Sequence, residues 1–358
     1  MNILHIITSL GMGGAEAMLY KLIQAQPHHN HIVICLNGDG VYKDRLEDLG
    51  VEVICLYPKK LDVFTRLAKL SQRVKSFSPD VTMAWMYHSF IFSLFLSGRK
   101  KTIWNVRQTL DGHKSDKLMT RIIIRIAGWL SFVPMFICHN SQRGILQHER
   151  IGYKSHKAKF IPNGFDVDKF SLNYPDVSTQ GKVKFVNVAR NHPAKGHDIL
   201  FSAFDLYLKS YGDATLDCYG YGVNEQEMQL KTHYPDIVNK VKLHGVSTSI
   251  QEVLSSYDVY VSPSRKEGFP NVVGEALVAG LVIAATDVGD CSSVVSCHGV
   301  LASEVNAAAL AQAMQQASTF SFDKKSRSER TRYAADAFSM ENVVASYEQL
   351  YNQVKAST

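Results

Sequence analysis

Three features are scarce in this sequence of 358 residues, and each scarcity excludes a class of protein. Its six cysteines are too few and too irregularly spaced for a disulfide-stabilised scaffold. No segment reaches the roughly 18 consecutive apolar residues of a membrane span, and the first residues lack the basic start of a secretory signal. Charged residues make up only 20% of the chain and hydrophobic residues 46%, proportions that exclude disorder and fibrous classes. We therefore expect a globular protein of the reducing cytoplasm.

The charge is divided unevenly along the chain, although the net charge is only +6. Residues 1–165 have 22 Lys and Arg against 11 Asp and Glu, and residues 166–358 have 17 against 22. The first part therefore carries +11 and the second −5. A basic half indicates an anionic partner such as lipid headgroups or nucleic acid. An unevenly charged, solvated surface is the alternative.

Short apolar runs alternate with amphipathic stretches along the whole chain. The runs expected to form strands are residues 3–8, 31–36, 51–56, 81–85, 102–106, 183–189, 214–219, 241–244, 259–261 and 282–285. The stretches expected to form helices include residues 15–25, 42–49 and 64–77. Such alternation predicts parallel sheets covered by helices on both faces. Because a Pro-, Ser- and Asp-rich stretch at 166–181 interrupts the pattern, we predict two consecutive α/β domains with a cleft between them.

A glycine-rich turn, Gly11-Met12-Gly13-Gly14, follows the first predicted strand and opens the first predicted helix. Glycines allow a backbone to approach a ligand closely, and a helix N-terminus favours negative charge. The dinucleotide fingerprint G-x-G-x-x-G is incomplete, because Glu16 occupies the place of its third glycine. The turn is therefore compatible with an anion site and equally with a tight strand-to-helix connection.

Two cations, Arg190 and Lys195, lie on the loop after the first predicted strand of the second domain. Parallel sheets bind ligands at the carboxyl ends of their strands, and two positive charges there suit a diphosphate. The loop is not a P-loop, since no G-x-x-x-x-G-K-[ST] precedes the helix. Two solvated loop cations are the alternative.

A pair of carboxylates, Glu267 and Glu275, flanks the segment Gly268-Phe269-Pro270-Asn271. Pro270 is well placed to open a helix that contains Glu275, with Glu267 on the loop ahead of it. The N–H groups of the first helical turn could bind an anion between the two carboxylates. Because carboxylates accept hydrogen bonds from vicinal diols, the pair suits a sugar at one end and a ribose at the other.

These motifs together resemble the retaining glycosyltransferases of family 4, which have the GT-B fold. The resemblance rests on these segments, in order: 11–14, 162–164, 190–196, 267–275 and 338–351. It implies two Rossmann-like domains that face a central cleft. Residues 1–165 would bind the acceptor, residues 166–335 the nucleotide sugar, and residues 336–358 would form a helix that returns to the first domain.

The resemblance also implies roles for the matching residues of the second domain. Arg190 and Lys195 would neutralise the diphosphate and the leaving group without a metal ion or cofactor. Glu275 would hold the nucleotide ribose. Glu267 would contact the donor sugar, helped by the following segment: Phe269, Pro270, Asn271 and Val272. The leaving phosphate would itself help accept the acceptor proton, so no protein base is expected.

Further implied contacts lie on glycine-containing loops. Gly13 and Gly14 would approach the donor phosphates from the first domain. The loops 219–222 and 244–246, including Val246, would form the wall of the nucleobase site. The implied partners are a nucleotide-sugar donor, with UDP-sugars favoured, and a glycan or lipid-linked acceptor of cell-surface polysaccharide or lipopolysaccharide synthesis. Nucleic acid is not among them.

One position departs from the family pattern. Many relatives have a histidine facing the donor sugar just after the strand at 102–106, where this chain has Arg107. The next histidine, His113, comes six residues later. We expect Arg107 to take over an electrostatic, catalytic role, with His113 swinging in from the loop as the alternative.

A basic amphipathic segment runs from Lys114 to Leu130 and includes Lys117, Arg121 and Arg125. Segments of this kind lie in membrane interfaces, so we expect peripheral contact with the anionic inner face of the cell membrane. A core helix whose arginines reach solvent is the alternative.

Other functions are weighed against this interpretation. The tract His28-His29-Asn30-His31 could bind a metal, but no cysteine or carboxylate nearby has ligand spacing, so a polar loop is expected instead. A non-catalytic GT-B-like binding subunit and, less favoured, a nicotinamide-dependent oxidoreductase are the alternatives to a glycosyltransferase.

Overall fold

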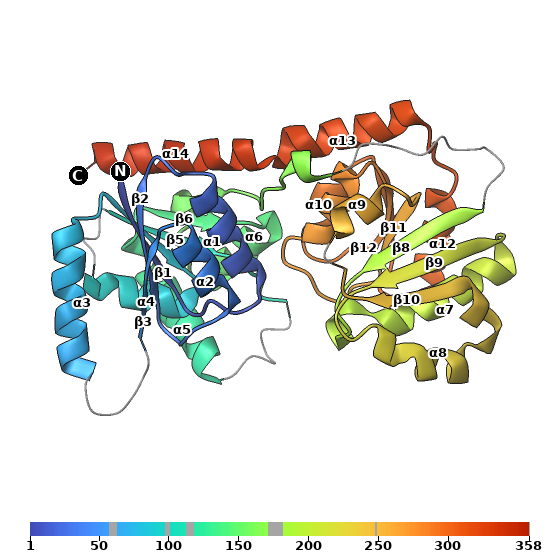
Figure 1. Ribbon diagram of the computed structural model, residues 1–358, viewed down its shortest axis with the longest axis horizontal. Helices are drawn as coiled ribbons and strands as arrows, with labels where there is room; N and C mark the ends of the chain where they lie inside the picture. Colours follow the sequence, from blue (N-terminus) through green and yellow to red (C-terminus); the bar gives the residue numbers. More distant parts are fainter. Residues whose placement is uncertain (57–62, 97–100, 112–117, 171–181, 248, 358) are drawn as a thin grey trace. The chain divides into compact units, whose positions relative to one another are not determined.

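The computed structural model describes residues 1–56, 63–96, 101–111, 118–170, 182–247 and 249–357. The chain forms two compact units (Figure 1), of which unit 1 consists of Met1–Gly164 with Met340–Thr358 and unit 2 of Phe165–Ser339. All six cysteines are free. In the described part of the chain, every helix is too short or too polar to cross a lipid bilayer.

Unit 1 is built on a parallel sheet of seven strands in the order β3-β2-β1-β4-β5-β6-β7. The strands are β1 (Asn2–Ile7), β2 (Asn30–Cys35), β3 (Glu52–Cys55), β4 (Val81–Trp85), β5 (Thr102–Val106), β6 (Phe136–His139) and β7 (Ala158–Phe160). In the central strands β4 and β5 every residue is buried. Continuous burial is the mark of a parallel sheet that is covered on both faces.

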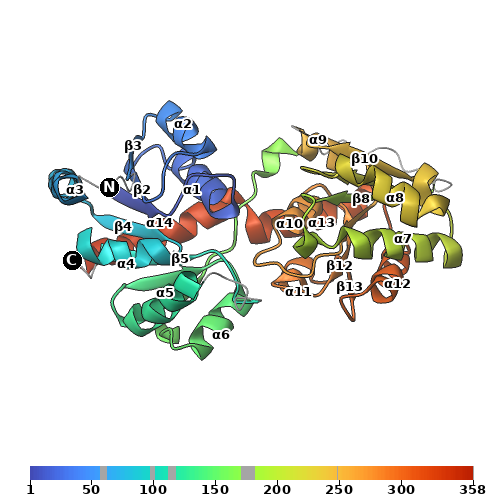
Figure 2. The same cartoon turned by 90° about the horizontal axis from the view of Figure 1, so that it is seen from below.

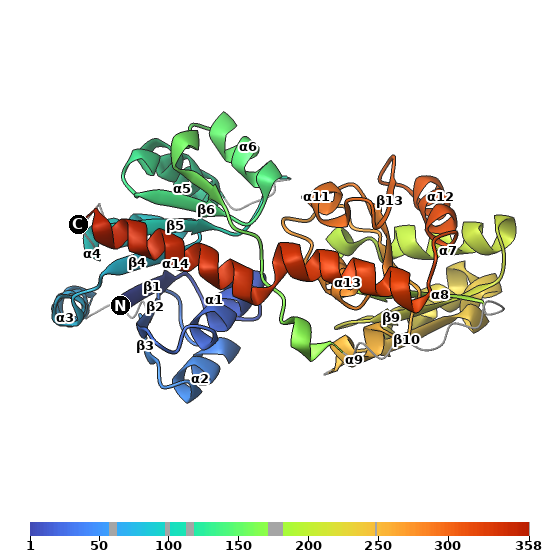
Figure 3. The ribbon, with the colours of Figure 1, turned by 90° about the horizontal axis from the view of Figure 1, so that it is seen from above.

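Helices cover both faces of this sheet. They are α1 (Gly14–Gln24), α2 (Val41–Asp48), α3 (Val63–Phe77), α4 (Tyr87–Leu96), α5 (Leu118–Trp129), α6 (Gln142–Arg150) and α14 (Met340–Ala356). Helix α14 packs with α1 on one face, where Tyr347 and Tyr351 are fully buried beside Ile3 and Trp85. Figure 3 shows α14 running across the strands of unit 1. The expected return of the C-terminal helix to the N-terminal domain is therefore confirmed.

Unit 2 repeats the design with six parallel strands in the order β10-β9-β8-β11-β12-β13. The strands are β8 (Val183–Val188), β9 (Ala214–Tyr219), β10 (Val241–Gly245), β11 (Val259–Ser262), β12 (Val282–Thr286) and β13 (Gly299–Ala302). The helices are α7 (His197–Ser210), α8 (Glu227–His233), α9 (Ile250–Leu254), α10 (Asn271–Val278), α11 (Cys291–Val295), α12 (Ala307–Ala317) and α13 (Lys324–Phe338). Two parallel sheets in two α/β units confirm the predicted fold class.

Separate hydrophobic cores stabilise the two faces of the unit 2 sheet. Helices α7 and α12 lie side by side on one face (Figure 2), where Phe201 and Met314 pack with Phe185 of β8. Helices α10 and α13 cover the other face, to whose core they contribute Leu277 and Phe338. The carboxyl ends of β8 and β11 stay accessible between these layers, which is where open α/β sheets bind ligands.

Candidate active site

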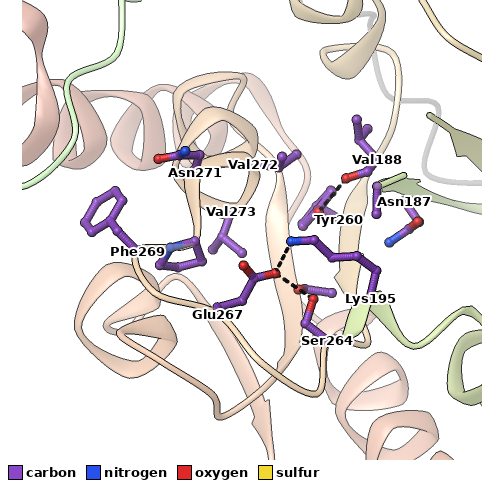
Figure 4. Close-up of a pocket in the computed structure, with 13 residues that line it drawn as sticks. Asn187, Val188, Lys195, Tyr260, Ser264, Glu267, Phe269, Asn271, Val272 and Val273 are labelled. Atoms are coloured by element: carbon purple, nitrogen blue, oxygen red, sulfur yellow. Dashed lines mark hydrogen bonds and ion pairs between the residues drawn. The ribbon is translucent and has the colours of Figure 1, made fainter. Parts of the chain in front are cut away.

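A pocket of about 140 Å³ lies at the carboxyl ends of β8 and β11 in unit 2 (Figure 4). Six residues predicted from the sequence line it: Lys195, Glu267, Phe269, Pro270, Asn271 and Val272. Arg190, Val246 and Glu275 are not part of its lining. The fold thus gathers two distant segments, the loop after β8 and the loop before α10, around one small space.

An ion pair joins those two segments. Lys195 Nζ donates to Glu267 Oε1 at 2.6 Å, and the Ser264 hydroxyl donates to the same oxygen at 2.7 Å. Figure 4 shows both side chains pointing at the Glu267 carboxylate. The Glu267 side chain is only 14% exposed and that of Lys195 27% exposed. Such a charge-assisted pair is stronger than neutral hydrogen bonds and holds Glu267 in one orientation.

Two glycines make this close approach possible. Gly196 has φ +69°, and a Cβ there would lie 2.2 Å from the carbonyl oxygen of Pro263. Gly289 has φ +59°, and a Cβ there would lie 2.6 Å from the carbonyl oxygen of Glu267. Because left-handed backbone and such contacts tolerate only glycine, both positions fix the loops that carry Lys195 and Glu267.

Arg265 links the same loops on the outside of the pocket. Its backbone N–H donates to the carbonyl of Ala194 at 2.8 Å, and its guanidinium donates to Asp198 at 2.8 and 2.5 Å. The guanidinium lowers the pKa of Asp198. This bidentate pair is exposed, so it positions the loops and adds little to stability.

Helix α10 begins beside the Lys195–Glu267 pair. The amides of Val272 and Val273 belong to its first turn, where no acceptor exists four residues back within the helix. The Phe269 side chain packs instead into an aromatic cluster with Phe165 and Phe338, at ring distances of 6.2 and 5.6 Å. The backbone around Pro270 is thereby anchored, and the positive N-terminal end of α10 lines the pocket, where it would favour an anion.

Glu275 lies inside α10, as expected, and is partly buried. Burial, together with the charges of Glu267 and Glu275, raises the pKa of Tyr260, whose hydroxyl donates to the Val188 carbonyl at 3.3 Å. Both predicted carboxylates therefore act on one buried tyrosine that lines the pocket.

The loops expected to form the nucleobase site lie next to each other in unit 2. The Gly220 N–H donates to the Gly245 carbonyl at 2.6 Å. The ring of Tyr219 stacks on that of His244, with centroids 4.4 Å apart, and His244 is hydrogen-bonded to Asp217 at 2.5 Å. Tyr221 and Val246 are 75% and 68% exposed. An exposed apolar surface of this kind suits a flat ring.

Arg190 lies on the loop after β8, at the carboxyl-end edge of the unit 2 sheet, as the pocket does. It comes two residues after the end of β8, is exposed, and forms no hydrogen bond or ion pair with the described residues. The neighbouring Asn191 N–H donates to the Tyr221 carbonyl at 2.7 Å. That bond ties the Arg190 loop to the loop expected to contact the nucleobase.

The glycine-rich turn of unit 1 is placed where the sequence predicts. Gly13 caps α1 and Gly14 is its first residue, and both are exposed. The carboxylate of Glu16 folds back over the turn. It comes so close that a Cβ on Gly13 would lie 2.4 Å from Glu16 Oε2. Ser9 donates to the other oxygen of Glu16 at 2.8 Å. A carboxylate thus stands at the positive end of α1.

Arg107 has partners within unit 1. Its guanidinium donates to Asn163 Oδ1 at 2.6 Å and to the Tyr347 hydroxyl of α14, and it lies 5.2 Å from the ring of Trp85. The side chain is 9% exposed. These contacts favour a positioning role at the junction with α14, and the catalytic role stays a prediction. The alternative, His113, lies outside the described residues.

Seven residues that line the pocket were not predicted from the sequence: Asn187, Val188, Ala189, Tyr260, Ser262, Ser264 and Val273. Asn187 donates to the Val261 carbonyl at 2.8 Å, while its buried Oδ1 has no partner among the described residues. Its position near the carboxyl end of a strand, three residues before Arg190, is the signal that could have found it. Ser264 lies three residues before Glu267 on the same loop, but its sequence context is that of any polar loop.

Comparison with known families identifies the chain. Residues 12–169 match the model described as Glycosyltransferase Family 4, and residues 182–319 match that of Glycosyl transferases group 1. The first match covers most of unit 1 and extends to residue 169, and the second lies within unit 2. The chain belongs to glycosyltransferase family 4. This membership confirms the resemblance drawn from the sequence. It also rules out the alternative of a nicotinamide-dependent oxidoreductase, because family 4 consists of retaining glycosyltransferases.

Two curated relatives of this family 4 chain share modest identity with it. The uncharacterized glycosyltransferase MJ1059 of Methanocaldococcus jannaschii is 23% identical over 252 residues, covering 65% of this chain and 61% of that protein. The capsular polysaccharide biosynthesis glycosyltransferase CapH of Staphylococcus aureus is 21% identical over 315 residues, 82% of this chain and 83% of CapH.

Solved structures share the fold over nearly the whole chain. HepE of Anabaena in complex with UDP superposes with a TM-score of 0.81 at 19% identity, covering 99% of this chain and 100% of HepE. HepE has also been solved with UDP-glucose. The apo lipopolysaccharide outer core galactosyltransferase WaaB gives 0.74 at 16% identity, covering 97% and 100%. These likenesses establish the GT-B fold for the family 4 chain.

Proposed function

We propose that this family 4 enzyme transfers a sugar from a UDP-sugar to a glycan or lipid-linked acceptor in cell-surface polysaccharide synthesis, without a metal ion. The observation that carries the proposal is the Lys195–Glu267 ion pair at the start of α10. In one pocket, a cation and a helix N-terminus suit the phosphates of a sugar diphosphate, and a carboxylate suits its sugar. HepE, which was solved with UDP-glucose, and CapH and WaaB, by their names, support the donor and the pathway.

The size of the pocket fits part of such a donor. A pocket of about 140 Å³ is smaller than the roughly 300–1,000 Å³ of sites that enclose a whole small molecule. It accommodates a phosphate and the sugar next to it. The nucleoside then lies over the loops of Tyr221 and Val246, and Glu275 takes the ribose hydroxyls.

The chemistry follows from these charges. The bond between the sugar C1 and the β-phosphate oxygen breaks, and the departing diphosphate gains negative charge. Lys195, Arg190 and the amides of Val272 and Val273 stabilise that charge, as preorganised donors do in other enzymes. The acceptor hydroxyl forms its bond to C1 on the same face, and its proton passes to the departing phosphate oxygen. Glu267 holds the sugar hydroxyls during the step.

Ligand-induced stabilisation tests the donor site. UDP should raise the melting temperature of the wild type in the presence of EDTA, GDP should raise it less, and NAD⁺ should have no effect. The Lys195→Ala variant should lose most of the UDP effect, while Lys209→Ala, which removes a surface lysine paired with Asp205 on α7, should keep it. Stabilisation by NAD⁺ and not by UDP contradicts the proposal.

Helix α5 supports a second part of the proposal, contact with an anionic membrane surface. Leu118, Ile122, Ile126 and Trp129 are 67%, 41%, 42% and 77% exposed and follow one another at helical spacing. Exposed apolar residues on one face of a helix that also carries Arg121 and Arg125 are typical of interfacial helices. Only Ile124, Ala127 and Gly128 of α5 are buried. Lys114 and Lys117, also named from the sequence, lie outside the described residues.

A further inference from the structure

Two histidines and a glutamate from opposite ends of the chain meet on unit 1. His28 and His29 lie in the turn between α1 and β2, and Glu348 lies in α14. His29 Nε2 is 2.9 and 3.0 Å from the two carboxylate oxygens of Glu348, and His28 Nε2 is 3.4 Å from Oε1. One ligand atom from each of the three residues falls within 4.8 Å of the others.

The surroundings orient this cluster. The Gln26 side-chain amide donates to Glu348 Oε1 at 2.6 Å, and Gln26 is fully buried. The ring of Tyr351, one turn along α14 from Glu348, contacts His29 edge-on at 6.2 Å between centroids. A hydrogen-bond donor behind a ligating carboxylate is the typical outer shell of a metal site.

We propose that His28, His29 and Glu348 bind one Zn²⁺ ion, with water as a fourth ligand, and that the ion fastens α14 to the α1–β2 turn of the same unit. Two imidazoles and one carboxylate are an established zinc donor set. With metal–ligand bonds of 2.0–2.1 Å in a tetrahedron, neighbouring ligand atoms lie about 3.4 Å apart. The His28–Glu348 distance already has this value, and His29 has to move away from Glu348 by about half an ångström.

The chemistry of the donors favours zinc over other cations. Imidazole nitrogens suit zinc, whereas magnesium and calcium prefer an all-oxygen shell. The His28 side chain is 59% exposed, so the ion can enter from solvent.

The zinc site is independent of sugar transfer. It belongs to unit 1, whereas the pocket with Lys195 and Glu267 belongs to unit 2. Its consequence is a metal-dependent attachment of the C-terminal helix, whose Tyr347 also receives the hydrogen bond from Arg107. The proposal therefore stands or falls separately from the donor and the acceptor.

Competition against a colorimetric zinc chelator tests the site, with tag-free, metal-stripped protein. The wild type should bind one equivalent of Zn²⁺ and melt at a higher temperature when it is bound. His28→Ala and Glu348→Gln should each weaken binding at least about tenfold, since even outer-shell losses typically cost about 10–100-fold. Substitution with Co²⁺ should give the strong visible absorption of a tetrahedral complex in the wild type and not in the variants.

Matched controls use exposed residues elsewhere in unit 1. His156→Ala and Glu341→Gln remove a histidine and a glutamate of the same kinds and should bind Zn²⁺ as the wild type does. The absence of stoichiometric binding overturns the proposal. So does binding that His28→Ala or Glu348→Gln leaves unchanged, because a three-ligand site needs both.

Discussion

Lys195 and Glu267 are 72 residues apart in sequence, yet their side chains meet at 2.6 Å in a pocket at the ends of β8 and β11. Each of the two side chains compensates the charge of the other. Under the proposed function, the diphosphate of the donor would compete with this carboxylate for Lys195 and leave Glu267 to the sugar hydroxyls. The pair would then divide the site into a phosphate side at Lys195 and a sugar side at Glu267.

Removal of either cation near this pocket should slow transfer, in addition to any loss of UDP binding. Lys195→Ala and Arg190→Ala should each lower turnover by about 10²–10³-fold, because a lost donor to a developing anion typically costs that much. The measurement is release of UDP from the UDP-sugar that the enzyme uses. Lys209→Ala should be near wild type, and near-wild-type rates for folded Lys195→Ala and Arg190→Ala place the diphosphate elsewhere.

The two glutamates should separate binding from reaction. Glu275→Gln should weaken UDP binding, because Glu275 is assigned to the ribose. Glu267→Gln should leave UDP affinity nearly unchanged and lower turnover, because Glu267 is assigned to the sugar that reacts. Calorimetric titration with UDP and turnover measurements on both variants check this split. Equal UDP affinity in wild type and Glu275→Gln refutes the ribose assignment.

Helix α5 should govern binding to anionic vesicles. Each arginine near an anionic surface contributes about 1 kcal/mol, so Arg121→Gln with Arg125→Gln should weaken binding by about 30-fold. Trp129→Ala should weaken it further, through the lost apolar contact. Co-sedimentation at low salt measures the effect, and high salt should reduce binding by the wild type.

Control variants and vesicles define the result for α5. Lys324→Gln with Lys325→Gln removes two exposed charges from α13 of unit 2 and should leave vesicle binding unchanged. Neutral vesicles should bind the wild type weakly. If wild type does not bind anionic vesicles at low salt, the apolar face of α5 does not dock on lipid.

Acid should destabilise the protein through a buried histidine. His148 Nδ1 donates to the Gly144 carbonyl and Nε2 accepts from the Tyr87 hydroxyl, both at 2.7 Å. Burial lowers the pKa of His148 to about 4, against about 6.5 when unfolded. Between these values only the unfolded chain binds the proton, so stability is lost as pH falls from about 6.5 to about 4.

The contribution of His148 can be measured by urea unfolding at pH 7, 6 and 5. In His148→Gln the slope of the unfolding free energy against pH should decrease by about 1.4 kcal/mol per pH unit, which corresponds to one proton. Burial also lowers the pKa values of His31 and His197 to about 4, so these two histidines still contribute to the slope in the variant. An unchanged slope means that His148 does not stay neutral in the folded state.

The sequence predicts the main strands and the donor segments, because both are local patterns. Apolar runs mark β1, β4 and β12, and Glu267 and Lys195 stand at the ends of strands where ligands bind. The apolar pattern of the sequence does not indicate β6, β7 and β13. These strands have only four, three and four residues, and β7 contains a lysine and no fully buried position. Periodicity does not distinguish such short segments from loops.

Contacts between distant segments are the other part that the sequence does not provide. The partners of Arg107 are Asn163 and Tyr347, the latter 240 residues away, and no local pattern indicates that pairing. The same holds for His29 and Glu348, separated by 319 residues. Local spacing in the sequence indicates no carboxylate ligand for the histidine tract, because Glu348 is far away along the chain. The fold supplies it from α14.

Turnover of nucleotide sugars in EDTA tests the central claim most directly. The wild type, incubated with a panel of UDP- and GDP-sugars and a lipid-linked glycan extract, should release UDP from one UDP-sugar at the same rate with and without EDTA. Lys195→Ala should reduce that rate by about 10²–10³-fold. UDP binding without turnover of any donor identifies a non-catalytic subunit, and strict dependence on Mg²⁺ or Mn²⁺ contradicts a diphosphate site made of Arg190, Lys195 and the start of α10.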